Sequence, residues 1–311
     1  MSTTDPSPNR VSGSSVPGKI LVTGATGSIG AHLVDTLQAR GAPFAVMCRR
    51  AEQRDSFRAR GIEAVEGDFS DPTSIRNAIP GFEQLFLLAP ESPDQYHQDT
   101  AAIDAAVEAG VRHVVKVSTL DANPTSAIPW ARDHARADAH LAATGLRWTR
   151  LAPGAFTKNL LELAPAIQFG VLPGTSGNGA TSWVDVQDIA EVAARVLCEP
   201  ELQGDQVGRS YILTGTHPLS FPEIATILGD ELGRKIRYVH LPGPVMYASL
   251  RLSGLPHWQA RGLVRQFVDV VRRGADQGRV HTFELDELLG HRPRGIADLV
   301  HSHRADFTRH R

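Results

Sequence analysis

A glycine-rich segment near the amino terminus has the residue types and spacing of a phosphate-binding turn. The segment Thr23–Gly30, with sequence TGATGSIG, follows a short apolar run and precedes a stretch of helical period. Gly24 permits a tight turn, Gly27 lets backbone N–H groups approach a pyrophosphate, and Gly30 allows the helix to pack closely on the strand. In this strand–turn–helix context the glycines favour dinucleotide binding over a purely structural turn.

Two arginines follow the second apolar run. Arg49 and Arg50 come directly after Phe44–Cys48, where folds that select NAD usually carry an acidic residue on the ribose 2′-hydroxyl. An acidic side chain would repel a 2′-phosphate, whereas a guanidinium offers it a charge-assisted pair of hydrogen bonds. The arginines therefore favour NADP(H); the plainer alternative is a solvated surface pair.

The elements that must position these residues follow from the alternation of short apolar runs with longer amphipathic stretches, a pattern typical of βαβ units. The expected strands are Lys19–Val22, Phe44–Cys48, Glu63–Glu66, Gln84–Leu88, Val111–Val117 and Leu146–Leu151. Helices are expected near Ile29–Ala39, Pro93–Ala109 and Ala131–Thr144. Together they predict an α/β fold with a doubly wound parallel Rossmann sheet.

Composition shifts along the chain predict its domain organisation. Residues 18–155 are expected to form the dinucleotide-binding domain, with 180–215 returning to its sheet. Pro and Gly concentrate after Leu151, so 156–179 and 216–311 are assigned to a smaller, mostly helical substrate domain. The spacing Ser220-x-x-Glu223 predicts a capped helix that ends at Leu232. Residues 1–17, rich in Ser, Thr and Pro, are expected to be a flexible tail.

Overall composition excludes several classes of protein. The 311 residues are 41% hydrophobic and 21% charged, which is typical of a globular protein. Lys and Arg total 32 against 34 Asp and Glu, so no basic excess indicates nucleic acid or a membrane as partner. Two distant cysteines, Cys48 and Cys198, predict a reducing, cytoplasmic location and no metal site.

Several further segments carry a family resemblance. They are Gly67-Asp68-Phe69-Ser70-Asp71, His134-Ala-Arg-Ala-Asp138, Pro153-Gly-Ala-Phe156-x-x-Asn159 and Trp183-Val-Asp-Val-x-Asp188. With these and the TGxxGxxG turn, most of residues 18–240 resembles the NmrA-like group of atypical short-chain dehydrogenases/reductases. The resemblance implies a Rossmann domain with a small helical substrate domain. It also implies either quinone and carbonyl reduction or redox sensing without catalysis.

The chain departs from standard short-chain reductases where these place Tyr-x-x-x-Lys, because it has Trp130-x-x-x-His134 there and no such dyad elsewhere. The usual proton relay of that tyrosine and lysine is therefore absent. His134 takes the place of the lysine, where an imidazole could bind ribose hydroxyls or protonate a developing alkoxide. The plainer alternative is a histidine on the helix surface. Ser118 and Thr119 could polarise a carbonyl from the loop above the sheet.

The residues expected to form the site gather at the carboxyl edge of the sheet. The expected cofactor-binding residues are Gly24, Thr26, Gly27, Ser28, Ile29, Arg49, Arg50, Asp68, Phe69, Leu88, Ala89, Pro90, Ser118, His134, Pro153 and Phe156. The expected catalytic residues are His134, Ser118 and Thr119, and the expected substrate contacts are Asn159, Trp183 and Tyr247. Asp71, Asp185 and Asp188 are interpreted as residues of helix amino termini.

These observations predict an NADPH-dependent reductase that acts on an apolar, conjugated or aromatic carbonyl or a quinone. Reduction of a quinone gives a weakly basic oxyanion that water can protonate, whereas a simple ketone needs a donor such as His134. A non-catalytic NADP(H)-binding redox sensor and a non-redox isomerase or lyase stay open as alternatives. The expected partner is a small apolar molecule, and the expected assembly is a monomer or homodimer.

Overall fold

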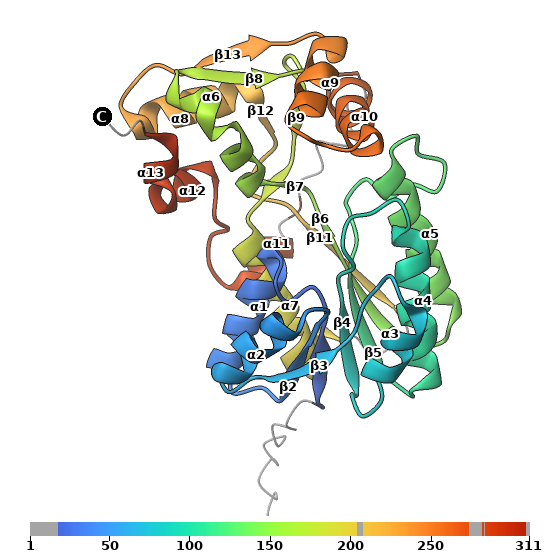
Figure 1. The fold of residues 1–311 in the computed structure, drawn as a ribbon. Helices are drawn as coiled ribbons and strands as arrows, with labels where there is room; N and C mark the ends of the chain where they lie inside the picture. Colours follow the sequence, from blue (N-terminus) through green and yellow to red (C-terminus); the bar gives the residue numbers. More distant parts are fainter. Residues whose placement is uncertain (1–17, 204–207, 274–281, 283, 309–311) are drawn as a thin grey trace, which may run out of the picture.

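The computed structural model describes residues 18–203, 208–273, 282 and 284–308. The predicted flexible tail, residues 1–17, lies outside these described residues. Figure 1 shows a parallel sheet flanked by helices, with a second group of helices and short strands beyond one end of the sheet. Within the described residues, no helix is both long enough and apolar enough to cross a membrane.

Seven parallel strands form the central sheet, in the order β11-β6-β5-β4-β1-β2-β3. They are β1 (Ile20–Val22), β2 (Phe44–Cys48), β3 (Glu63–Glu66), β4 (Gln84–Leu87), β5 (His113–Val117), β6 (Arg147–Pro153) and β11 (Arg209–Leu213). All six strands expected from the sequence occur, and the predicted α/β fold class is confirmed. This order brings the β1–α1 turn and the ends of β2, β4 and β5 to one edge of the sheet.

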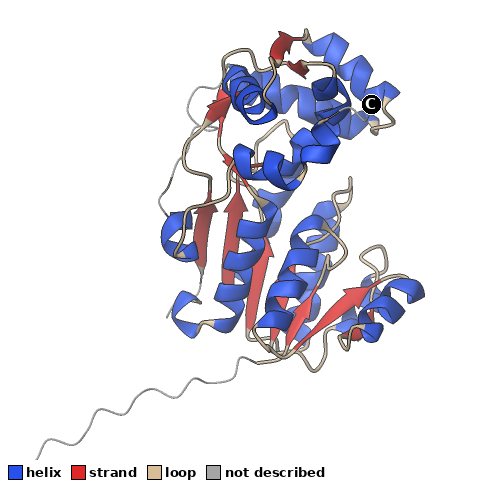
Figure 2. Ribbon diagram, turned by 90° about the vertical axis from the view of Figure 1, so that its left-hand side faces the viewer, coloured by secondary structure: helices blue, strands red, loops and turns tan. Residues whose placement is uncertain are grey.

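Helices cover both faces of this sheet (Figure 2). One layer holds α1 (Ser28–Ala39), α2 (Ala51–Ala59), α7 (Val186–Cys198) and α11 (Glu284–Leu289). The other holds α3 (Pro72–Ala78), α4 (Gln95–Glu108) and α5 (Pro129–Ala143). Successive side chains of a strand point to opposite faces. Ile20 and Val22 therefore pack into the first layer's core and Leu21 into the second, and all three are fully buried.

The segment 180–215 returns to the central sheet only in part. Helix α7 packs against α1, the short η2 (Pro200–Leu202) follows, and β11 pairs with β6 and forms one edge of the sheet. In contrast, β10 (Trp183–Val184) pairs with β7 (Ala155–Phe156) in a separate two-stranded sheet. Strand β10 therefore does not join the central sheet, because its partner β7 lies past the end of β6.

The remaining elements surround a separate hydrophobic core, which includes Leu160, Ile167, Phe221, Ile224 and Val300. These elements are η1 (Thr157–Leu163), α6 (Ala164–Gln168), β8 (Val171–Gly174), β9 (Ala180–Thr181), β12 (Leu219–Ser220), α8 (Phe221–Leu232), β13 (Arg237–His240), α9 (Gly243–Leu252), α10 (His257–Arg265), the π-helical η3 (Gln266–Arg272), α12 (Ile296–Ser302) and α13 (Arg304–Phe307). The predicted capping box begins α8, where the backbone N–H of Ser220 donates to Glu223 Oε2 at 2.8 Å.

Candidate active site

A cavity of about 650 Å³ runs along the carboxyl edge of the central sheet. One wall consists of the β1–α1 turn and the segments that follow β2, β3, β4, β5 and β6. The opposite wall comes from α10 and η3, which contribute Leu263, Gln266, Phe267 and Val270. Glu91, after β4, accepts a hydrogen bond from Gln259 Nε2 of α10 at 3.2 Å, so the two walls also touch directly.

The β1–α1 turn has the geometry of a pyrophosphate cradle. Gly24 has a φ of +65°, and a Cβ there would lie 2.8 Å from the carbonyl oxygen of Leu88. A Cβ on Gly30 would collide with the carbonyl of Gly24, so the helix can approach the turn only without a side chain. Gly27 begins α1 without a side-chain cap, which leaves first-turn N–H groups for an anion. The residues present therefore fit a dinucleotide phosphate.

The two predicted arginines have different surroundings. Arg49 lines the cavity, and its Nε lies 3.9 Å from Asp68 Oδ2 with 68% of the side chain exposed. Arg50 does not line the cavity. It is the residue before α2, and its backbone N–H donates to Gln53 Oε1 at 3.3 Å. Of the two predicted arginines, Arg49 is therefore the one whose side chain lines the cavity.

Asp68 lines the cavity beside Arg49 and is held as a carboxylate. Burial tends to raise the pKa of Asp68, but hydrogen bonds from Ser70 and the charge of Arg49 lower it overall. Asp71, three residues on, accepts a hydrogen bond from the N–H of Thr73 at 2.9 Å and caps α3. Asp71 thus acts as a helix cap.

The other predicted cofactor-binding residues gather in the same cavity. They are Thr26, Ser28, Ile29, Phe69, Leu88, Ala89, Pro90, Ser118, His134, Pro153 and Phe156. They lie at or after the ends of five strands, β1, β3, β4, β5 and β6, so the sheet edge brings together residues that span about 130 positions of the sequence. Their position in one cavity is compatible with the predicted role.

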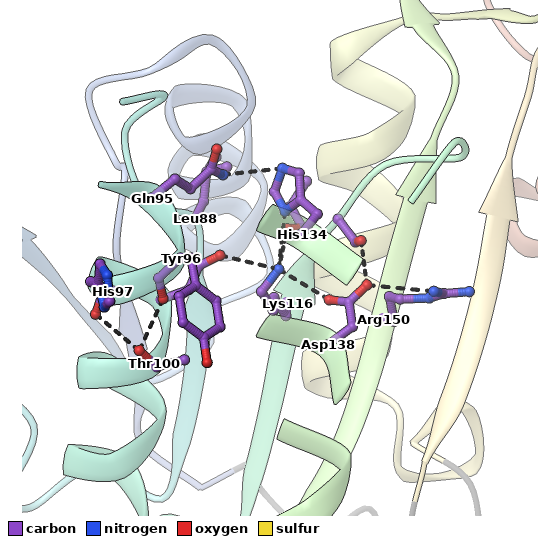
Figure 3. Close-up of polar contacts among 12 residues, drawn as sticks. Leu88, Gln95, Tyr96, His97, Thr100, Lys116, His134, Asp138 and Arg150 are labelled. Carbon is purple, nitrogen blue, oxygen red and sulfur yellow. Dashed lines mark hydrogen bonds and ion pairs between the residues drawn. The ribbon is translucent and has the colours of Figure 1, made fainter. Parts of the chain in front are cut away.

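His134 lies on α5 and faces the cavity on one side and a buried lysine on the other (Figure 3). Its Nδ1 is 3.1 Å from Lys116 Nζ, and its Nε2 is 3.1 Å from the side-chain amide of Gln95. Burial, followed by the positive charge of Lys116, lowers the pKa of His134 well below its ordinary value. His134 is therefore a neutral imidazole at physiological pH, and it is more than a solvated histidine on a helix surface.

The hydroxyl groups of Ser118 and Thr119 both donate to carboxylates. Ser118 Oγ donates to Asp138 Oδ2 at 2.5 Å, and Thr119 Oγ1 donates to Asp121 Oδ1 at 2.6 Å. A hydroxyl has one proton to give, so in this arrangement both can accept a hydrogen bond from a ligand but cannot also donate one. Neither Ser118 nor Thr119 therefore has a hydroxyl proton left for a ligand in this arrangement.

The three predicted substrate contacts, Asn159, Trp183 and Tyr247, are not among the residues that line this cavity. Trp183 is 5% exposed in the separate core, where its Nε1 donates to the carbonyl of Leu219 at 3.2 Å. Tyr247 lies on α9 with its hydroxyl 2.8 Å from His257 Nδ1, and Asn159 is exposed on η1. Polar and aromatic residue types alone did not reveal which helix faces the sheet edge.

Several cavity residues were not expected from the sequence as part of the site. Gln95, Trp130, Leu263 and Gln266 line the cavity, and Lys116 lies behind it. Trp130 had one available signal, since it occupies the place of the usual tyrosine. Lys116 had another, since it interrupts the apolar run of β5 with a charge. Among the described residues, no group of three or more His, Cys, Asp or Glu side chains could hold a metal ion.

Comparisons with known proteins agree with this geometry. A family model described as NAD(P)H-binding matches residues 24–200. An NAD(P)H azoreductase of Xenophilus azovorans is 36% identical over 238 residues, which cover 76% of this chain and 82% of that protein. Quinone oxidoreductase 2 of Escherichia coli is 29% identical over 286 residues, which cover 90% of this chain and 97% of that protein.

Solved structures extend the likeness to the whole described fold. The structure of the Escherichia coli NADPH-dependent quinone oxidoreductase in complex with NADPH matches with a TM-score of 0.81 and 28% identity, covering 91% of this chain and 99% of that one. A Citrobacter triphenylmethane reductase with NADP(H) matches with a TM-score of 0.80 at 24% identity, which shows the shared fold. This chain thus belongs to the NAD(P)H-binding family, within the NmrA-like atypical short-chain dehydrogenases/reductases and their NAD(P)H-dependent reductases.

Proposed function

We propose that this protein uses NADPH to reduce a conjugated or aromatic carbonyl compound or a quinone. The observation that carries the proposal is one continuous cavity lined both by the glycine turn with Arg49 and by an apolar wall of Trp130, Phe267 and Val270. The printed activities of the azoreductase and the quinone oxidoreductase support an acceptor with an extended π-system. Aromatic and aliphatic walls favour such flat, apolar molecules.

The cofactor would extend along the sheet edge. We assign the pyrophosphate to the β1–α1 turn, the 2′-phosphate to Arg49, and the adenine to Asp68 and Phe69. The nicotinamide end is assigned to the segment Pro153–Phe156, which lines the far part of the cavity. Bound NADPH supplies the hydride. We further propose that 18–155, together with 180–215, form the cofactor-binding domain. The segments 156–179 and 216–311 would then form the domain that binds the acceptor.

The chain itself contributes a proton donor and an apolar cavity wall. Neutral His134 can donate the proton on Nε2 to an acceptor oxygen as negative charge develops there. The imidazolate left behind would face the ammonium of Lys116, 3.1 Å from Nδ1, and would regain its proton from water. Ser118 and Thr119 would accept hydrogen bonds from ribose or acceptor hydroxyls, because their protons are directed to carboxylates. A quinone needs little help from His134, whereas a ketone needs its proton.

The test compares two histidines on the same helix. His134→Gln removes the donor that lines the cavity, whereas His140→Gln changes a histidine whose Nε2 is 2.7 Å from Asp104, outside the cavity. We expect NADPH oxidation with a quinone panel in the unchanged protein. We also expect His134→Gln to lower kcat for ketones by about 100-fold, given the usual contribution of a general acid, with a smaller loss for quinones. His140→Gln should retain full activity.

Two results would count against this proposal. Tight NADPH binding without oxidation by any quinone, ketone or enone would favour the redox sensor. Equal activity of His134→Gln and the unchanged protein toward ketones would remove His134 from the reaction and leave only the reductase assignment.

A further inference from the structure

Lys116 is a fully buried cation in the middle of the central sheet. It belongs to β5, whose five residues are all buried, and the exposed fraction of its side chain is 1%. Removing an ammonium group from water is costly unless it is paired. Its Nζ lies 3.3 Å from Asp99 Oδ2, 3.1 Å from Asp138 Oδ1 and 3.1 Å from His134 Nδ1 (Figure 3). Such a site needs an explanation beyond the packing of the sheet.

The contact with His134 determines where the imidazole carries its proton. An ammonium group can only donate hydrogen bonds, so Nδ1 of His134 must accept with its lone pair. The ring proton of a neutral imidazole is then on Nε2. An imidazolium would instead direct an N–H at the ammonium across 3.1 Å, which is a contact between like charges.

We propose that Lys116 is a positioning residue that holds His134 neutral, with its ring proton on Nε2 on the side of the cavity. The catalytic meaning of this assignment rests on the proposed function, since it makes His134 a hydrogen-bond donor at every physiological pH. The assignment of the tautomer itself rests on the contacts of the described residues alone.

The charged side chains around Lys116 keep its amino group protonated. Burial opposes the charge of Lys116, but Asp99 and Asp138 raise its pKa above the ordinary value. Burial raises the pKa of Asp99, against the lowering by Lys116, and the neighbouring charges of Asp138 and Asp133 act in the same direction as burial. Arg150 Nη1 lies 3.4 Å from Asp138 and supplies a second positive charge.

The polar groups that contact His134 or its partner Lys116 therefore come from three elements. Strand β5 provides Lys116, helix α4 provides Gln95 and Asp99, and α5 itself provides Asp138 one turn further on. The Gln95 atom that lies 3.1 Å from His134 Nε2 is the amide nitrogen, which can only donate. The proposed tautomer therefore requires a half-turn of this amide about its last bond, which presents its oxygen to the Nε2 proton. A bound acceptor oxygen would take over that proton from Gln95, which also lines the cavity.

Lys116 is also linked, through Asp138, to Ser118, a second polar residue that lines the cavity. Asp138, whose Oδ1 pairs with Lys116, accepts the hydroxyl proton of Ser118 on its other oxygen. Lys116 thus orients His134 as a donor, and through Asp138 it orients Ser118 as an acceptor. One buried charge gives the two ends of the network opposite hydrogen-bonding roles.

Nitrogen NMR of the ring tests this assignment without a turnover measurement. Histidine labelled with ¹⁵N is introduced into the full chain, and the His134 signals are assigned by their loss in His134→Gln. We expect Nε2 to carry the proton and the ring to stay neutral from pH 8 down to pH 5.5. A ring that carries its proton on Nδ1, or that titrates near its ordinary value, would overturn the proposal.

Removal of the lysine supplies the causal half of the test. Lys116→Met leaves Asp99 without its partner, so the variant is made together with Asp99→Asn, and Asp99→Asn alone serves as the matched control. We expect His134 to titrate within the range pH 5.5–8 only in the variants that lack Lys116. If Lys116→Met with Asp99→Asn folds and His134 still does not titrate, the lysine has no such role. If that variant does not fold, the tautomer measured in the unchanged chain decides.

A pH profile links the tautomer to the reaction and separates it from the proposed function. In the unchanged protein kcat for a ketone should show no inflection from His134 between pH 5.5 and 8. The variants without Lys116 should gain one, while the KM for NADPH changes less than twofold. If no acceptor is reduced at all, the proposed function fails, but the NMR result still stands or falls by itself.

Discussion

Charge reversal at Arg49 gives the sharpest test of cofactor selection. A hydrogen bond to a charged group contributes about 1.5–3 kcal/mol, which corresponds to about a 10- to 100-fold change in affinity. Arg49 is largely exposed, so water weakens its pairing, while the carboxylate of Arg49→Asp adds repulsion toward a 2′-phosphate. We therefore expect Arg49→Asp to raise the Kd for NADPH by about 10- to 100-fold and to leave that for NADH within about threefold.

Arg50→Asp is the matched control because it makes the same charge change one residue away and outside the cavity. Kd values for both nucleotides are measured by titration calorimetry at two ionic strengths. Arg50→Asp should lose only the small, salt-sensitive part of NADPH affinity that reflects the general field. Equal losses for NADPH and NADH in Arg49→Asp, or equal losses in the two variants, would refute the assignment of Arg49 to the 2′-phosphate.

Three further predictions follow from the packing. Gly24→Ala places a methyl group 2.8 Å from the Leu88 carbonyl oxygen at a positive φ, so nucleotide binding by calorimetry should fall below detection while the fold, followed by circular dichroism, persists. Gly262→Ala places a methyl group against the ring of Trp130, so KM for the acceptor should rise several-fold, whereas Gly243→Ala, with contacts of 3.4 Å or more, should change little. Burial and then Arg147 lower the pKa of His113 to about 4, so stability is full above pH 6.5 and falls by up to about 3 kcal/mol as the pH drops toward 4. Urea titrations at both pH values should show this loss in the unchanged protein and not in His113→Gln.

The sheet could be predicted closely from the sequence because its signals are local. Most strands of the central sheet contain a short apolar run, and β1 shows why three residues suffice when both faces are covered. The positions of the glycine turn and of Arg49 could be predicted equally well, because each directly follows a strand. Their positions do not depend on how the carboxyl-terminal helices pack.

The cavity wall formed by α10 and η3 could not be predicted in the same way. Trp183 and Tyr247 were chosen for residue type, yet their positions depend on how α8, α9 and α10 pack on one another. Helical periodicity says which side of a helix is apolar, but not whether that side meets a core or a cavity. Lys116 was overlooked because its importance lies in partners on α4 and α5, which are far away in sequence.

The origin of the two cavity walls has a consequence for engineering the protein. The nucleotide side is built from residues before position 157, whereas the opposite side is one continuous stretch of α10 and η3. A library of variants restricted to Leu263, Phe267 and Val270 would therefore reshape what is accepted without touching the residues assigned to NADPH. We expect such variants to retain the NADPH affinity of the unchanged protein while their acceptor preferences diverge.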